Sequence, residues 1–324
     1  VVSLVNASRN EIIFTSGGTE SNNIAILGLK EFGLNNNKKH IITSAIEHKA
    51  VLEPIQELEK LGFEVDIINV DQSGRVNPKD IKDKIREDTL LISIMGVNNE
   101  TGVIQPISEI IEIIQDHDCY FHVDAAQMFG KDIDTLSNKR IDLISISGHK
   151  IFGPKGIGAL VTRLRNFNKP PLQPLFFGGG QQAKLRPGTL PVHLIVGLGT
   201  AAKIAKKNLK KRQEQNKKIY DQIIKLMKSL NGNLNGDEKY LLGNCINFSV
   251  PNVDAEAFML TTKDLISISN GSACTSSTYE PSHVIKAMTN DEDKLKGAIR
   301  ISWCHLTDDK LPIDDIFSRV KNIM

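Results

Sequence analysis

The chain has 324 residues, of which 40% are hydrophobic, and its 40 lysines and arginines nearly balance 38 aspartates and glutamates. A net charge of +2 gives no field that would attract nucleic acids or membranes, so we expect neither direct nucleic-acid binding nor a membrane location. No apolar run approaches the roughly 20 residues that span a bilayer, and the four cysteines form no CxxC pair. This pattern excludes a disulfide framework or zinc ribbon, predicts no metal site, and favours the reducing cytoplasm.

Strand and helix patterns alternate through the first half of the chain. The expected strands are 11–15, 40–44, 64–70, 90–95, 120–124, 143–147 and 158–162, and the expected helices are 20–33, 50–61, 77–87 and 107–116. This alternation predicts an α/β fold with a mainly parallel sheet covered by helices on both faces. Chemistry in such sheets gathers at the carboxyl ends of strands, where Thr15, Asp124 and Lys150 fall.

A segment rich in glycine and proline, 170–191, precedes an expected long helix over 196–230. We place a domain boundary there, with a large domain over 1–200 and a smaller α+β domain over 201–324. The smaller domain should contain strands 244–250, 265–269 and 298–303 and helices 255–262 and 282–287. The basic run Lys203 to Lys218 should form a solvated helix face, with docking of an acidic partner or a nucleic acid as the alternative.

A glycine loop follows the first expected strand. The run SGGTES over 16–21 opens a helix, which directs backbone N–H groups and the positive end of the helix dipole to one point. We interpret this loop as an anion cradle suited to a phosphate group. The alternative is an ordinary turn in which Ser and Thr cap the helix.

A carboxylate and a lysine stand at the ends of two further strands. Asp124 ends the strand 120–124 and is followed by two small alanines, and Lys150 follows Ser147-Gly148-His149. Such a pair suits a pyridoxal-phosphate enzyme, in which the carboxylate keeps the pyridine nitrogen protonated and the lysine holds the aldehyde as a Schiff base. The alternative is that Asp124 caps a helix and Lys150 is a surface charge.

Two further residues are candidates for the site. His48 lies just beyond a strand, where it could cover a flat cofactor or move protons, although a lone histidine is often a cap or core residue. Arg300 stands among apolar neighbours on a strand and therefore needs an anionic partner, either a structural carboxylate or a substrate carboxylate.

Cys274 differs from the other three cysteines in its surroundings. It lies in the run SACTSS over 272–277, whose small and polar residues offer no core to bury a thiol. With Lys150, it suggests an enzyme that uses both a Schiff base and a thiolate. We interpret Cys119, Cys245 and Cys304 as core residues, although Cys304 lies close enough to Arg300 in sequence to reach the same cleft.

These motifs together resemble the cysteine desulfurases, class V members of the fold-type I pyridoxal-phosphate enzymes. The matching segments are FTSGGTESNN (14–23), TSAIEHKAV (43–51), VNNETG (97–102), HVDAAQ (122–127), SISGHK (145–150), RPGTLPVH (186–193) and GSACTS (271–276). The resemblance covers 11–306 and implies a mainly parallel mixed sheet flanked by helices, with a smaller α+β C-terminal domain. The Ser-Ala-Cys-Thr form is similar to the long-loop subgroup of the family.

The resemblance also implies a role for each residue of the site. Lys150 would hold the cofactor, Asp124 would pair with its ring nitrogen, Gln127 would reach its ring hydroxyl, and His48 would stack on the ring and assist proton transfer. The residues expected to bind the phosphate are Gly18, Thr19, Ser147 and His149, with Thr189 supplied by the other subunit of a homodimer. Asn99 and Arg300 would bind the carboxylate of the substrate.

The implied reaction converts L-cysteine to L-alanine and leaves a persulfide on Cys274, which a sulfur-acceptor protein then collects. The sulfur could serve iron–sulfur cluster assembly, tRNA thiolation or DNA sulfur modification. The alternatives are a selenocysteine lyase or an aminotransferase of the same fold, or an inactive scaffold that docks partners.

The chain departs from the family pattern in two places. It lacks the family's N-terminal segment, which we interpret as a sign of a fragment or a trimmed chain. Trp303-Cys304-His305 replaces the sequence common among the members that serve iron–sulfur assembly.

Overall fold

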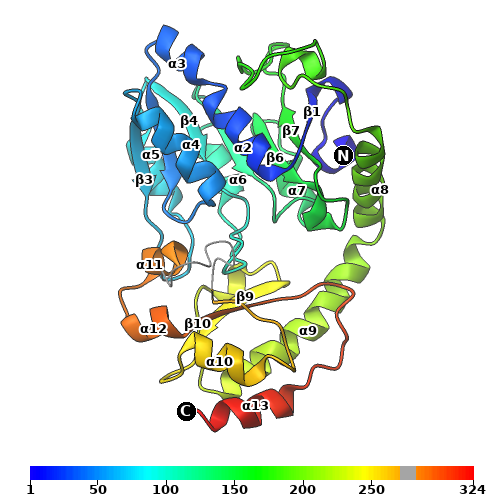
Figure 1. Ribbon diagram of the computed structural model, residues 1–324. Coiled ribbons are helices and arrows are strands. Elements are labelled where there is room, and N and C mark those ends of the chain that lie inside the picture. Colours follow the sequence, from blue (N-terminus) through cyan, green and yellow to red (C-terminus); the bar gives the residue numbers. More distant parts are fainter. Residues whose placement is uncertain (271–281) are drawn as a thin grey trace. The chain divides into compact units, whose positions relative to one another are not determined.

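The computed structural model describes residues 1–270 and 282–324, and contacts divide the chain into two compact units (Figure 1). Unit 1 comprises Val1–Ile68, Asn77–Val97 and Gln105–Leu209. Unit 2 comprises Asn69–Val76, Asn98–Ile104 and Lys210–Met324. Two short segments from the first half of the chain thus join unit 2, whereas the expected domains, 1–200 and 201–324, are continuous stretches. Those domain boundaries stay a prediction.

Unit 1 is built on a seven-stranded sheet with the order β1-β7-β6-β5-β4-β2-β3. Its strands are β1 (Ile12–Thr15), β2 (His40–Ser44), β3 (Glu64–Ile68), β4 (Thr89–Ser93), β5 (Tyr120–Asp124), β6 (Leu143–Ser147) and β7 (Gly158–Thr162). Strands β3, β2, β4, β5 and β6 pair in parallel, and β7 is antiparallel to both β6 and β1. The expected mainly parallel, mixed sheet is confirmed. Buried Ile and Leu side chains along these strands form the core, as β-branched and apolar residues favour a doubly covered sheet.

The helices of unit 1 include shorter pieces than the sequence pattern predicts. They are α1 (Val2–Val5), α2 (Gly18–Leu27), α3 (Lys30–Asn35), α4 (Lys49–Glu59), α5 (Pro78–Lys84), α6 (Ile107–Ile113), α7 (Ile133–Leu136) and α8 (Val192–Lys207). The expected helix over 20–33 is wrong in its continuity, because α2 and α3 are separate. The reason is that the carbonyl of Gly28 accepts a hydrogen bond from Gln173 N at 2.8 Å, so a distant segment takes an acceptor that a continuous helix would use.

The expected helix over 196–230 is also two helices, α8 and α9 (Leu209–Ser229). Asn208 separates them as the C-cap of α8, where its backbone N–H and its side-chain Nδ2 both donate to the Ile204 carbonyl, at 3.0 and 3.1 Å. The basic run over 203–218 is therefore divided between two helices instead of lying on one. Most of its lysines are exposed, as a solvated face requires.

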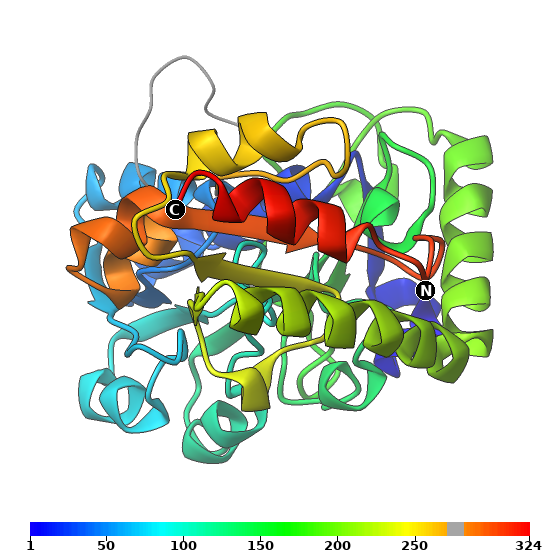
Figure 2. The ribbon, with the colours of Figure 1, turned by 90° about the horizontal axis from the view of Figure 1, so that it is seen from below.

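Unit 2 has a three-stranded antiparallel sheet, β10-β9-β8, packed with helices (Figure 2). Its elements are β8 (Asn233–Leu234), β9 (Cys245–Ser249), β10 (Ala298–Ser302), α9, α10 (Ala255–Thr262), α11 (His283–Met288), α12 (Glu292–Gly297) and α13 (Ile313–Lys321). The expected strand over 265–269 is wrong, because Leu265 N and Ile266 N both bond back to the Thr262 carbonyl and only Ser269 bridges to Arg300. Within the described ranges, no helix is long and apolar enough to cross a bilayer.

Candidate active site

The candidate site in unit 1 lies where strands β1, β5 and β6 end. Gly158, the first residue of β7, pairs with both Thr15 at the end of β1 and Ser147 at the end of β6. A Cβ at Gly158 would lie 2.5 Å from the Ile146 carbonyl oxygen and 2.7 Å from the Gly17 Cα. Only glycine therefore lets the loop after β1 approach this edge of the sheet.

The loop after β1 leads into α2, whose N-cap has no side chain. Gly17 is the N-cap of α2 and makes no side-chain capping bond. A Cβ at Gly18 would lie 3.5 Å from Ser147 Cβ, and the Ser147 hydroxyl lies 3.1 Å from His149 Nδ1. Three of the residues expected to bind phosphate are thus side by side, and Thr19 is exposed in the first turn of the helix. The arrangement fits a phosphate group at a helix N-terminus.

Asp124 is 6% exposed at the end of β5 and is held by two neutral donors. Asn22 Nδ2 donates to Oδ2 at 2.7 Å, and the Ala126 amide donates to Oδ1 at 2.9 Å. Among the described residues, no lysine, arginine or histidine pairs with this carboxylate. A buried carboxylate held by neutral amides is suited to meeting a cationic group of a ligand. The contribution of Asn22 was missed by the sequence analysis, although its place one turn after Gly18 was a usable signal.

Lys150 lies in a 3-10 turn, Gly148–Ile151, that directly follows β6. Its side chain is exposed. Burial lowers the pKa of the neighbouring His149, and the charges of Lys150 and Lys155 lower it further, so the imidazole favours its neutral form. Gln127, half-buried beyond β5, accepts a hydrogen bond from Lys131 Nζ at 3.3 Å.

His48 is the N-cap of α4 and is exposed. Its Nδ1 accepts a hydrogen bond from the Ala50 amide at 3.0 Å, so the neutral ring carries its proton on Nε2. The capping role that the sequence offered as the ordinary alternative is therefore present. It also fixes the ring at one nitrogen and leaves Nε2 as the proton donor.

A neutral polar row crosses the sheet next to Asp124. His122 is fully buried in β5, with Nδ1 2.8 Å from Ser93 Oγ and Nε2 2.9 Å from Ser145 Oγ. Burial lowers the pKa of His122 to about 3, so it stays neutral in the physiological range. It satisfies buried serines of β4 and β6 without adding charge beside Asp124.

The predicted substrate-binding pair lies within unit 2. Arg300 Nη1, on β10, donates to the Asn99 carbonyl oxygen at 3.3 Å. No carboxylate in the described parts of the chain pairs with Arg300, so the structural carboxylate that the sequence offered as an alternative is not found there. Thr189 is exposed, and among the described residues we find no hydrogen bond from it to the other predicted site residues. Cys274 lies outside the described residues.

The remaining cysteines are placed as follows. Cys119 and Cys245 are buried and Cys304 is half-buried, all as free thiols. The Cys304 Sγ accepts a hydrogen bond from the Leu306 amide at 3.4 Å.

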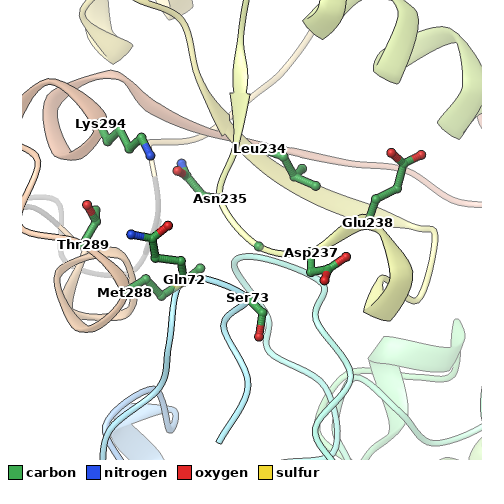
Figure 3. Close-up of a pocket in the computed structure, with 10 residues that line it drawn as sticks. Gln72, Ser73, Leu234, Asn235, Asp237, Glu238, Met288, Thr289 and Lys294 are labelled. Atoms are coloured by element: carbon green, nitrogen blue, oxygen red, sulfur yellow. The ribbon is translucent and has the colours of Figure 1, made fainter.

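A cavity of about 340 Å³ in unit 2 is not the predicted site (Figure 3). Polar groups of Gln72, Asn235 and Lys294 line it, and Asn235 is held by Asn247 and Ser249. None of the predicted catalytic or binding residues that the structure describes is among its lining residues.

Residues 1–310 match the family model described as Aminotransferase class-V. The chain belongs to the class V aminotransferase family. This membership confirms the expected resemblance, and members of this family that are cysteine desulfurases use pyridoxal phosphate.

Similar class V proteins include cysteine desulfurases. The mitochondrial cysteine desulfurase of Saccharomyces cerevisiae is 45% identical over 301 residues, which are 93% of this chain and 60% of the yeast protein. The crystal structure of DndA from Streptomyces lividans is 47% identical with a TM-score of 0.86, and the match covers 94% of this chain and 85% of DndA. A structure of SspA in complex with cysteine is 38% identical with a TM-score of 0.81. That match covers 94% of this chain and 84% of the SspA chain. These neighbours confirm the expected fold-type I architecture.

Proposed function

We propose that this protein is a cysteine desulfurase that converts L-cysteine to L-alanine and carries the released sulfur on Cys274. The observation that supports this most directly is the placement of three features at the carboxyl ends of strands in unit 1. The N-terminus of α2 follows β1, Asp124 ends β5, and the turn that contains Lys150 follows β6. The chain spans 60% of the length of its yeast relative, so the activity of the whole protein is part of the proposal.

The residues at this edge fit pyridoxal phosphate by the chemistry of their donor groups. The α2 amides, the Ser147 hydroxyl and His149 would hold the phosphate, because they offer N–H and O–H donors at the positive end of a helix. Asp124 would meet the ring nitrogen, since both of its oxygens are already oriented by amides. Lys150 is the exposed amine that would bond the aldehyde carbon. Pyridoxal phosphate supplies an electron sink for the carbanion formed at the substrate's α-carbon.

The protein's own groups would handle the protons. Lys150, once released by substrate, is the amine that would take the proton from the substrate's α-carbon and return it. His48 would donate through Nε2, because Nδ1 is occupied by the Ala50 amide. The Asp124 carboxylate would favour a protonated ring nitrogen. Gln127 would contact the ring hydroxyl.

The substrate carboxylate would bind Arg300 together with Asn99, which the structure brings into contact in unit 2. Cys274 would then attack the substrate's sulfur as a thiolate. The carbon–sulfur bond of cysteine breaks as a sulfur–sulfur bond forms, so cysteine and one enzyme thiol yield alanine and one enzyme persulfide. No external oxidant or reductant is needed.

We further propose a homodimer in which Thr189 serves the neighbouring subunit's site, because its exposed side chain makes no hydrogen bond to the described site of its own chain. A sulfur-acceptor protein would remove the persulfide by thiol exchange. We expect a reducing compartment, the cytoplasm, because Cys119, Cys245 and Cys304 are free thiols.

The test is a single turnover with L-cysteine, followed by alanine quantification and peptide mass spectrometry. Wild-type protein should release alanine and carry one extra sulfur on the Cys274 peptide. Cys274→Ser should bind the cofactor but release no alanine, since a hydroxyl is a poor nucleophile toward sulfur. Cys304→Ser is the matched control and should behave as wild type. Sulfur found on Cys304, or alanine released by Cys274→Ser, would contradict the proposal.

A further inference from the structure

The chain segment 181–189 is bonded to both sides of the loop between β1 and α2. The Phe14 amide, in β1, donates to Gln182 Oε1 at 2.7 Å. Arg186 Nε donates at 2.9 Å to Oε1 of Glu20, which lies in α2. The bonded residues are 168 and 166 positions apart in the sequence. The fold therefore connects the candidate phosphate loop with a segment from far along the chain.

Glu20 joins Arg186 to the backbone of that loop. It is the third residue of α2, and its Oε2 accepts a hydrogen bond from the Ser16 amide at 2.6 Å. The Arg186 guanidinium also lies close to Gly188, since a Cβ at Gly188 would lie 3.6 Å from Arg186 Nη1. Gly188 directly precedes Thr189. One ion pair therefore connects the loop before α2 with the backbone next to Thr189.

The backbone of the segment has a conformation that residues other than glycine seldom adopt. The consecutive residues Gln182, Ala183 and Lys184 have φ angles of 47°, 57° and 64°. Left-handed backbone costs free energy for such residues, so it persists only where surrounding contacts hold it. The contacts of Gln182 and Arg186 lie at the two ends of this turn. Loss of the Arg186 contact should therefore loosen the segment.

The charge of Glu20 lies where a phosphate group would bind. Burial raises the pKa of Glu20, but hydrogen bonds from Arg186 and Ser16 outweigh it and hold the pKa below its ordinary value. The carboxylate is therefore negative at neutral pH, in the first turn of α2. Two anions at one helix end repel each other unless a cation compensates one of them. The Glu20 and Arg186 side chains are only 13% and 22% exposed, so water and salt screen this pair less than a surface pair.

We propose that Arg186 is a positioning residue for the phosphate site: it compensates the charge of Glu20 at the N-terminus of α2 and holds the segment that carries Thr189. This inference rests on the proposed function, which assigns the phosphate to that helix end. Arg186 acts through Glu20 and through the backbone, without touching the phosphate. An unpaired Glu20 would repel the phosphate, so the pair sets how strongly the site binds it.

Equilibrium binding of pyridoxal phosphate tests the charge effect. Arg186→Gln should weaken binding roughly tenfold, because Glu20 keeps its charge beside the phosphate. Adding Glu20→Gln to Arg186→Gln should recover most of that loss, since the repelling charge is then gone. Arg186→Lys should retain most of the affinity, because it keeps the cation. Lys184→Gln is the matched control and should bind as wild type, because it removes a positive charge of the same segment that makes no ion pair within the described ranges.

The recovery distinguishes charge compensation from two simpler roles of Arg186. A direct contact with the phosphate would be lost from the single and the double variant alike, and a purely structural pair would leave the double variant no better than the single one. A double variant that binds no more tightly than Arg186→Gln would therefore overturn the proposal. Urea unfolding shows whether each variant folds. Where Arg186→Gln does not fold, Glu20→Gln alone decides, because it should bind at least as tightly as wild type, and weaker binding would contradict the charge role.

Hydrogen exchange followed by mass spectrometry tests the second effect. The backbone amides of 181–189 should exchange faster in Arg186→Gln and in the double variant than in wild type, because both lose the bond to α2. Lys184→Gln should exchange as wild type does. Equal exchange in all four proteins would refute the holding role.

Inorganic phosphate separates this inference from the proposed function, with binding measured by calorimetric titration. Wild type that binds inorganic phosphate, with the same order of affinity among the variants, but does not bind pyridoxal phosphate would reject the proposed function and keep the role of Arg186. Wild type that binds pyridoxal phosphate, with no recovery in the double variant, would reject the role of Arg186 and keep the proposed function. Absence of binding to either ligand would reject both.

Discussion

At the scale of single residues, burial and donors decide which groups in unit 1 carry charge. Asp124 has a donor on each oxygen, burial raises the pKa of the Glu47 carboxyl to about 8, and burial lowers the pKa of His122 to about 3. Burial therefore disfavours charge on Glu47 and on His122, while two amide donors hold the Asp124 carboxylate at the end of its strand. This distribution suits a site that must bind one cationic ring nitrogen.

Asp124→Asn should bind pyridoxal phosphate and lose activity by roughly 100-fold or more, because removing one partner of a buried charge pair costs about 3 kcal/mol or more. Alanine production from L-cysteine measures this effect. Asn22→Ala offers a comparison, since it removes only the 2.7 Å hydrogen bond to the carboxylate and should cost less. Near-normal activity of Asp124→Asn would reject the assigned role.

Lys150→Ala should abolish the cofactor bond that borohydride reduction makes permanent, because no other predicted site residue offers a primary amine. Mass spectrometry of reduced wild-type protein should find the added mass on the peptide that contains Lys150. Lys155→Ala, five residues further along the chain, is the matched control and should keep the attachment. Attachment that persists in Lys150→Ala would move the assignment to another lysine.

At the scale of secondary-structure elements, close backbone contacts hold the glycine loop in place. The loop after β1 lies against β7 and β6 at Gly158, and α2 starts from it without a side-chain cap. Helix α2 then packs on β6 and β7, so the position of its N-terminus is fixed by the sheet. The candidate phosphate site therefore depends on the absence of a side chain at one position of β7.

Gly158→Ala should destabilise unit 1 by roughly 1–3 kcal/mol, because the new methyl group would meet the Gly17 backbone at 2.7 Å. It should also weaken cofactor binding, since Gly17 and Gly18 must move. Urea unfolding and a pyridoxal-phosphate titration measure the two effects. Gly199→Ala in α8 is the control, because its methyl group would meet nothing within 4 Å, and a gain of about 0.5–1 kcal/mol is expected. Unchanged binding in Gly158→Ala would remove this loop from the phosphate site.

At the scale of the whole molecule, the predicted functional residues divide between the two units. The predicted cofactor residues all lie in unit 1, whereas Asn99 and Arg300 lie in unit 2. Asn99 reaches unit 2 through the short segment Asn98–Ile104, which leaves unit 1 and returns to it. The chain over 95–105 therefore contributes residues to both units.

A shared site between subunits predicts complementation. Thr189→Ala and Lys150→Ala proteins should each be nearly inactive, and a mixture allowed to exchange subunits should recover about a quarter of wild-type activity. The reason is that half of the randomly formed dimers are mixed, and each has one site with both residues intact. Light scattering establishes the dimer, and alanine release measures recovery. No recovery after demonstrated subunit exchange would contradict the sharing of Thr189.

The sequence by itself determined the fold class and the order of the sheet's strands along the chain. Strands such as 143–147 and 158–162 were predicted with their observed ends, because apolar runs bounded by polar residues mark buried strands. It also determined the candidate residues His48, Asp124 and Lys150, since each lies at or just beyond the carboxyl end of a strand, where chemistry gathers.

Only the tertiary structure decided where helices break and which buried groups hold protons. The break after α2 depends on Gln173, far along the chain, taking the Gly28 carbonyl, and no local pattern encodes that contact. The pKa of Glu47 likewise depends on its burial, on the Met95 amide in the loop after β4 and on Asp124 at the end of β5. Local periodicity reports which face of an element is buried, whereas a pKa or a lost helix bond depends on groups that only folding places nearby.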